Sequence, residues 1–123
     1  MESAFGLQEN PSDSLFEELA LVAERDSTVV GLAQIKVAGE DADLLKLFVE
    51  PALLGSGVGR LLFEWATTRA RRLGAVWMTI EADPGAAPFY ECMGACHAGF
   101  APSQSIPGRM LPRMQMELNR ALR

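Results

Sequence analysis

The stretch from Leu44 to Leu62 constrains the fold of this 123-residue chain more than any other part of the sequence. It reads LLKLFVEPALLGSGVGRLL: an apolar run of strand length, then Pro51, then three glycines at alternate positions closed by Arg60, then an amphipathic helical pattern. Glycine permits close backbone approach and positive φ angles. The first turn of a helix offers unpaired N–H groups and a partial positive charge. The stretch therefore predicts a strand, a turn and a helix whose N-terminus binds a phosphate-bearing molecule.

Other phosphate-binding loops are the first alternatives for this turn. A Walker A loop needs four residues between its glycines, followed by Gly-Lys-Ser/Thr, and neither Lys36 nor Lys46 lies near the turn. A dinucleotide fingerprint that starts at Gly55 needs a third glycine where Arg60 stands, although Glu81 is at about the distance of its acidic residue. From the glycines alone, a generic nucleotide-binding domain and a plain tight turn both stay open.

A second motif narrows these alternatives. The block EADPGAAPFYECMGA at Glu81–Ala95 follows the first motif at a distance that accommodates a helix, a turn and a strand. Together the two blocks resemble the GCN5-related N-acetyltransferase (GNAT) superfamily. Val49–Arg60 is similar to its acetyl-CoA loop, V-x-P-x-x-R/Q-x-x-G-x-G/A, and the second block is similar to its D-P-N-A-x-x-F-Y-x-x-x-G motif. The resemblance extends from Leu19 to about Asn119, which is most of the chain.

The hydrophobic pattern predicts six strands, two helices and a loop-like N-terminus. The strands are expected at Leu19–Glu24, Thr28–Val37, Asp43–Val49, Ala75–Glu81, Ala95–Phe100 and Pro112–Leu118, and the helices at Gly57–Leu73 and from Pro84 to about Met93. Residues 1–14 are expected to form a polar loop, and Leu15–Leu19 a short helical turn. This order predicts an α/β (α+β) fold. The resemblance implies a GNAT-like mixed, mostly antiparallel sheet flanked by helices. We expect one domain over residues 1–123, with a core at 19–119 and a short segment at 1–18.

Composition limits the partners and the location. The net charge of −5 disfavours a nucleic-acid surface. No apolar run approaches the ~20 residues needed to span a bilayer, and the N-terminus lacks a signal-peptide pattern. We therefore expect a cytoplasmic protein with no membrane or nucleic-acid partner. Cys92, Cys96 and His97 lack the spacing of a metal site. We expect buried reduced cysteines, a partly buried histidine and no metal.

The sequence departs from the family pattern at three places. Family members usually begin with a strand and one or two helices that help to form the acceptor site. This chain has only ~18 residues there, too few for the full set. An open sheet edge needs cover, so we expect a homodimer that covers it and completes the acceptor pocket. Leu54 stands at the Arg/Gln position of the loop, and Gly85 at the usual Asn. These departures leave an alternative open: a CoA-binding regulatory module without efficient catalysis.

The resemblance implies direct attack of an amine on the thioester of acetyl-CoA. The N–H groups of Gly55 to Arg60 would hold the pyrophosphate, with the Arg60 guanidinium as an added charge. Backbone groups of Leu47 and Val49 would pair with the pantetheine arm, and the Leu47 amide would polarise the thioester oxygen. Tyr90, the only tyrosine, would protonate the leaving thiolate. The full set expected to bind the cofactor is Leu47, Phe48, Val49, Leu54, Gly55, Ser56, Gly57, Val58, Gly59, Arg60, Gly85, Phe89 and Tyr90.

The general base and the acceptor stay open at this stage. Asp43 begins the central strand where some family members carry a glutamate, Glu81 ends the next strand, and water is a third candidate. The acceptor is expected to be a primary amine of a small molecule or peptide. The loop Ser103–Arg113 lines either the acceptor side, a dimer contact or solvent, and we favour the latter two.

Overall fold

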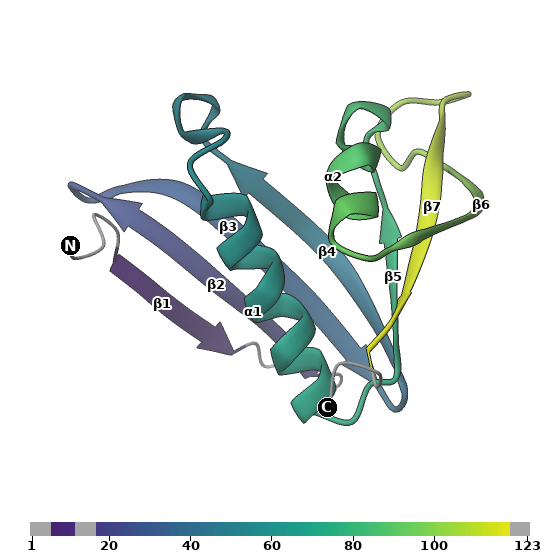
Figure 1. Cartoon of the computed structure of the whole chain (residues 1–123), viewed down its shortest axis with the longest axis horizontal. Coiled ribbons are helices and arrows are strands. Elements are labelled where there is room, and N and C mark those ends of the chain that lie inside the picture. The colour runs from purple at the N-terminus through teal and green to yellow at the C-terminus, as the bar shows by residue number, and fades with distance from the viewer. Residues whose placement is uncertain (1–5, 12–16, 119–123) are drawn as a thin grey trace.

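The computed structural model describes residues 6–11 and 17–118. In this part of the chain, strands and helices follow one another in the order shown in Figure 1. The strands are β1 (Gly6–Pro11), β2 (Glu17–Arg25), β3 (Thr28–Ala38), β4 (Asp41–Val49), β5 (Trp77–Glu81), β6 (Cys96–Pro102) and β7 (Met110–Glu117). The α-helices are α1 (Val58–Arg72) and α2 (Ala87–Cys92), and each follows a single 3-10 turn, at Pro51–Leu53 and Pro84–Ala86.

All of these strands form one sheet in the order β1-β2-β3-β4-β5-β7-β6. Neighbouring strands are antiparallel except β4 and β5, which are parallel and joined through α1. β4 is therefore central, as its apolar sequence predicts. The six expected strands and two helices are all present, with boundaries displaced by a few residues.

The prediction for the N-terminal segment is wrong where the structure describes it. Gly6–Pro11 is not a loop but an edge strand, which pairs along its whole length with β2. Residues Gly6 to Glu9 are exposed, so backbone pairing rather than burial holds this strand in place, and its sequence has no apolar alternation to reveal it. The helical turn expected at 15–19 is also wrong from Glu17 onward, because β2 begins there; residues 15 and 16 lie outside the described part.

Both helices pack on the same face of the sheet (Figure 1). Phe63 from α1 and Tyr90 from α2 belong to one buried cluster with Leu44 of β4 and Ile80 of β5. The opposite face has no helix over it in the described part of the chain, and it leaves the side chains of Leu45, Phe48 and Trp77 more than 40% exposed. The apolar character of β4 on both faces therefore does not mean burial on both faces.

The seam between β4 and β5 opens part-way along β4. The pairs Asp41–Trp77 to Leu44–Ile80 are in register, and the pairing with β5 ends there. On its other side β4 stays paired with β3 as far as Val49, with a register shift at Gln34/Ile35 that leaves Leu45 as an extra residue. A bulge of this kind bends and twists the strand that contains it. Figure 1 shows β4 and β5 diverging from their paired ends.

The two cysteines and the histidine lie at the surface, in and after helix α2. Cys92 and Cys96 are free and exposed, so the prediction that they are buried is wrong. His97 is also exposed, and its Nε2 lies 2.6 Å from Glu91 Oε2.

No helix in the described part has both the length and the apolar character that a bilayer crossing requires.

Candidate active site

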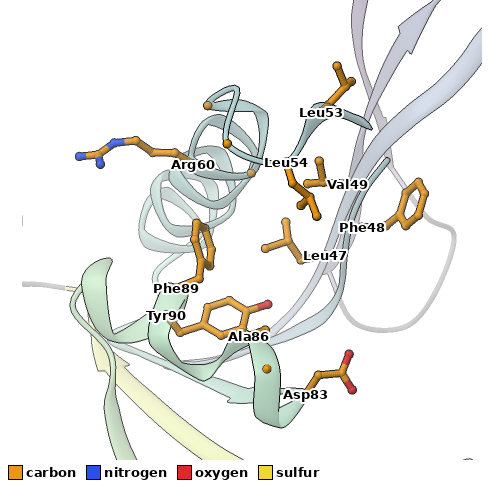
Figure 2. Close-up of a pocket in the computed structure, with 14 residues that line it drawn as sticks. Leu47, Phe48, Val49, Leu53, Leu54, Arg60, Asp83, Ala86, Phe89 and Tyr90 are labelled. Atoms are coloured by element: carbon orange, nitrogen blue, oxygen red, sulfur yellow. The ribbon is translucent and has the colours of Figure 1, made fainter. Parts of the chain in front are cut away.

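A cavity of about 660 Å³ lies at the open end of the seam, between the loop before α1 and helix α2 (Figure 2). The sequence places its lining in three segments: the end of β4, the glycine loop, and the turn that leads into α2. Its lining residues are Leu47, Phe48, Val49, Leu53, Leu54, Gly55, Gly57, Gly59, Arg60, Asp83, Gly85, Ala86, Phe89 and Tyr90.

The glycine loop presents a row of free N–H groups at one end of the cavity. Gly57 is the N-cap of α1, and the first helical hydrogen bond runs from the Leu61 N–H to the Gly57 carbonyl oxygen at 3.0 Å. The N–H groups of Val58, Gly59 and Arg60 therefore have no partner within the helix. No protein acceptor within the described part of the chain takes them, or the N–H groups of Gly55 and Gly57. These five donors and the positive end of α1 have the arrangement that favours binding of an anion.

The turn uses the N–H of Ser56, one of the expected backbone donors, and also the N–H of Leu54. The Leu54 N–H donates to the Pro51 carbonyl oxygen at 3.2 Å, and the Ser56 N–H donates to the Leu53 carbonyl oxygen at 3.0 Å. The Ser56 hydroxyl donates to the same oxygen at 2.5 Å. The expectation that the Ser56 N–H binds the pyrophosphate is therefore wrong, because the turn uses this N–H. The Leu54 side chain still lines the cavity, whereas Ser56 and Val58 do not.

Backbone geometry explains why glycines occupy this loop. Gly55 and Gly57 have φ angles of 84° and 96°, which L side chains rarely adopt. Gly59 has an ordinary helical backbone, but a Cβ there would lie 3.5 Å from Val49 Cγ2 and 3.8 Å from the Phe89 ring. Its missing side chain therefore keeps the cavity open between β4 and α2.

The Arg60 side chain is placed differently from the expectation. Its Nε lies 3.2 Å from Glu64 Oε2, and both side chains are largely exposed. Figure 2 shows the guanidinium pointing away from Leu47 and Tyr90. Arg60 therefore borders the mouth of the cavity, and only its backbone N–H belongs to the row of free donors at the start of α1.

Leu47 and Val49 turn their backbone groups toward the open seam. The Glu50 N–H donates to the Val30 carbonyl oxygen at 2.8 Å. Along an antiparallel strand, every second residue directs its backbone N–H and C=O to the same neighbouring strand. The backbone groups of Phe48, two residues before Glu50, therefore also face β3. The N–H and C=O groups of Leu47 and Val49 then point the other way, where β5 is no longer paired. An extended chain in the seam finds strand-like partners there.

Tyr90 closes the other end of the cavity. Its ring packs against Phe63 and Phe89, with centroid distances of 5.6 Å and 5.2 Å, and its hydroxyl is turned toward Leu47 in Figure 2. The structure records no hydrogen bond from this hydroxyl to any described residue. Burial, with a smaller contribution from the negative charge of Asp83, raises the pKa of Tyr90 to about 12. The phenol is therefore protonated at neutral pH and free to donate its proton into the cavity.

The remaining expected residues divide between two cavities. Gly85 and Phe89 line the first cavity, while Phe48 borders it with its ring turned away (Figure 2). Asp43 does not reach it: Asp43 and Glu81 line a second cavity on the uncovered face of the sheet. Three residues that were not expected from the sequence also line the first cavity: Leu53, Asp83 and Ala86. Asp83 stands in the second motif, and only the fold shows that its charge acts on Tyr90.

Comparison with known proteins assigns the family. The model of the acetyltransferase (GNAT) domain matches residues 17–94, which is more than half of the chain. This chain belongs to the GNAT family. The predicted resemblance is thereby confirmed, and the domain includes both motifs and the seam. No curated protein sequence matches the chain significantly.

Solved GNAT structures share the fold. A GCN5-related N-acetyltransferase from Rhodopseudomonas palustris is 27% identical with a TM-score of 0.68; the match covers 81% of this chain and 61% of that one. Nourseothricin acetyltransferase is 24% identical with a TM-score of 0.73, over 89% of this chain and 69% of that one. N-acetylglutamate synthase from Neisseria gonorrhoeae, solved with coenzyme A and N-acetylglutamate, is 18% identical with a TM-score of 0.65, over 80% of this chain and 25% of that one. The predicted mixed α+β fold of this GNAT domain is therefore confirmed.

Proposed function

We propose that this GNAT domain is an acetyl-CoA-dependent N-acetyltransferase that transfers the acetyl group by direct attack of a primary amine. The arrangement of the first cavity supports this proposal most strongly. It has free N–H donors at the glycine loop, unpaired strand backbone at Leu47 and Val49, and an unpartnered phenol at Tyr90. These three features, in this order, match a pyrophosphate, a pantetheine arm and a thioester.

Each residue then has a defined task. The N–H groups of Gly55 and of Gly57 to Arg60 hold the pyrophosphate. The backbone of Leu47 and Val49 aligns the pantetheine amides, and the Leu47 N–H donates to the thioester oxygen as it gains charge. The amine nitrogen forms a bond to the acetyl carbon and loses a proton to water, the C–S bond breaks, and the Tyr90 hydroxyl gives its proton to the leaving sulfur and regains one from solvent.

Calorimetric titration with acetyl-CoA tests the cofactor, with NAD and ATP as controls. We expect selective binding of acetyl-CoA at micromolar strength, about −8 kcal/mol. Preference for NAD or ATP would instead support the generic nucleotide-binding alternative. The variant Tyr90→Phe should keep this affinity and lose turnover, because the phenylalanine ring preserves the packing against Phe63 and Phe89 but has no proton to give.

The alternative of a CoA-binding regulatory module makes a different prediction. In that case acetyl-CoA binds, but no amine in a panel is acetylated, and Tyr90→Phe changes nothing that can be measured. The unpartnered hydroxyl of Tyr90 favours the enzyme, because a purely structural tyrosine in a buried cluster ordinarily has a bonded hydroxyl.

A homodimer remains part of the proposal. β1 is an edge strand that pairs only with β2 among the described strands, and a second copy is a suitable cover for such an edge. Light scattering of the purified chain tests this: a strictly monomeric mass at working concentration would contradict it.

A further inference from the structure

The second cavity, of about 470 Å³, lies on the sheet face opposite the two helices. Along β5, Trp77, Thr79 and Glu81 alternate with Met78 and Ile80, which are buried beneath the helices, so their side chains point to the uncovered face. The loop between β6 and β7 closes one side of the cavity. Its lining residues are Asp43, Leu44, Leu45, Thr79, Glu81, Ser103, Gln104, Ser105 and Leu111.

This cavity lies at the point where β4 and β5 separate. Asp43 pairs with Thr79 and Leu44 pairs with Ile80, and these are the last two pairs between the strands. Leu47 is three residues further along β4, within about 10 Å at about 3.3 Å per residue. The two cavities therefore meet the same open seam from opposite faces of the sheet. A molecule in the second cavity approaches the seam from the side opposite the glycine loop and Tyr90.

The charged side chains that line the second cavity are all acidic. It contains two carboxylates, three hydroxyls and one amide, and no cationic side chain. Neither Asp43 nor Glu81 takes part in an ion pair with a described residue. Their cross-strand neighbours Lys36 and Arg113 are basic, but neither of these two lines the cavity. A surface of this kind attracts ammonium groups and disfavours carboxylates.

We propose that the second cavity binds the acceptor and that the acceptor is a small amine with a second ammonium group, a diamine or polyamine. This inference rests on the acetyltransferase function proposed above. One ammonium group lies against Asp43 and Glu81, and the other end reaches the seam as a free amine. A volume of about 470 Å³ is within the range of small-molecule sites.

The reaction balances with groups already placed. The ammonium that reacts first loses one proton to water. Its nitrogen then forms the C–N bond, and the C–S bond breaks. The second proton of that nitrogen leaves as the amide forms, and the sulfur takes one proton from Tyr90, which is restored from solvent. The products are the acetylated amine, free CoA and one released proton.

Three amines with carbon chains of equal length test the charge preference. Putrescine carries a second ammonium, butylamine a methyl group and γ-aminobutyrate a carboxylate. CoA release by the full chain would be measured with each. We expect kcat/KM to fall in the order putrescine, butylamine, γ-aminobutyrate, with putrescine preferred over butylamine by about tenfold or more.

Matched variants locate the preference in the cavity. Asp43→Asn and Glu81→Gln are each expected to reduce the putrescine-to-butylamine ratio by about tenfold. Asp41→Asn on β4 and Glu117→Gln on β7, which pairs with β5, make the same change of charge outside the cavity. These controls are expected to keep the wild-type ratio. Titration of each variant with acetyl-CoA checks that the first cavity is intact.

The outcomes separate the two proposals. Equal use of the three amines, preference for γ-aminobutyrate, or no turnover of putrescine by a protein that binds acetyl-CoA would overturn the acceptor assignment alone. An equal fall in the ratio for cavity and control variants would also overturn it, because a general charge effect would then explain the preference. Failure of the wild-type chain to bind acetyl-CoA would overturn the acetyltransferase function itself.

Discussion

The raised pKa of Tyr90 is open to a direct measurement, because Tyr90 is the only tyrosine in the chain. Burial of the phenol raises its pKa from 10.0 to about 12. In the folded protein about one phenol in ten should then be ionised at about pH 11, against about nine in ten in the urea-unfolded chain. The near-ultraviolet absorbance of phenolate reports this single group, since tryptophan does not ionise there.

The same shift predicts how stability depends on pH. Folding favours the protonated phenol, so its contribution is fully present below about pH 10 and is lost as the pH rises toward about 12. At about pH 11 the loss is about 1.4 kcal/mol. Urea unfolding of the wild-type chain and of Tyr90→Phe, compared at about pH 8 and about pH 11, should show this extra loss only in the wild type.

Two results would refute the reasoning about Tyr90. One is a folded-state titration midpoint near 10, which would mean that water reaches the phenol as freely as in the unfolded chain. The other is an equal loss of stability at high pH in the wild type and in Tyr90→Phe. In either case the phenol would not be held in its protonated form by burial between α1 and α2.

Three further predictions concern the helices and the glycine loop. Phe63→Ala should lower the free energy of unfolding by about 3–5 kcal/mol, because Phe63 of α1 is 1% exposed and packs in one cluster with α2 and the sheet; a loss below about 1 kcal/mol in urea unfolding would contradict its central place in the core. Gly57→Ala should cost about 1–2 kcal/mol, because φ is 96° there, whereas Gly59→Ala should leave stability unchanged or slightly raised and weaken acetyl-CoA binding in a calorimetric titration. If Gly59→Ala bound acetyl-CoA normally, the cofactor would not pass between Val49 and Phe89. Arg60→Ala should change stability by less than about 0.5 kcal/mol, because its ion pair is exposed, and a larger loss in thermal or urea unfolding would show that Arg60 has a structural role.

The sequence predicts the parts of the candidate site that depend on local backbone geometry. Positive φ angles at Gly55 and Gly57 and the free N–H groups at the start of α1 follow from glycines placed directly before a helical pattern. The place of Tyr90 in a short helix follows from the second motif. The sequence did not predict that the N–H groups of Leu54 and Ser56 donate hydrogen bonds within the loop, because these bonds depend on the turn that Pro51 begins.

The sequence by itself determined the loop that presents free amides and the order of strands and helices from β2 onward, because local spacing and periodicity specify them, and its two motifs carried the resemblance to the family. Only the tertiary structure decided the rest. Edge strand β1 depends on pairing with β2, which its exposed side chains do not signal. The opening of the seam depends on a bulge at Leu45 and on where β5 stops pairing. The separation of Tyr90 from Asp43 and Glu81 depends on which face of the sheet the two helices cover. Each of these is a relation between residues distant along the chain, and such relations are fixed by strand register and packing.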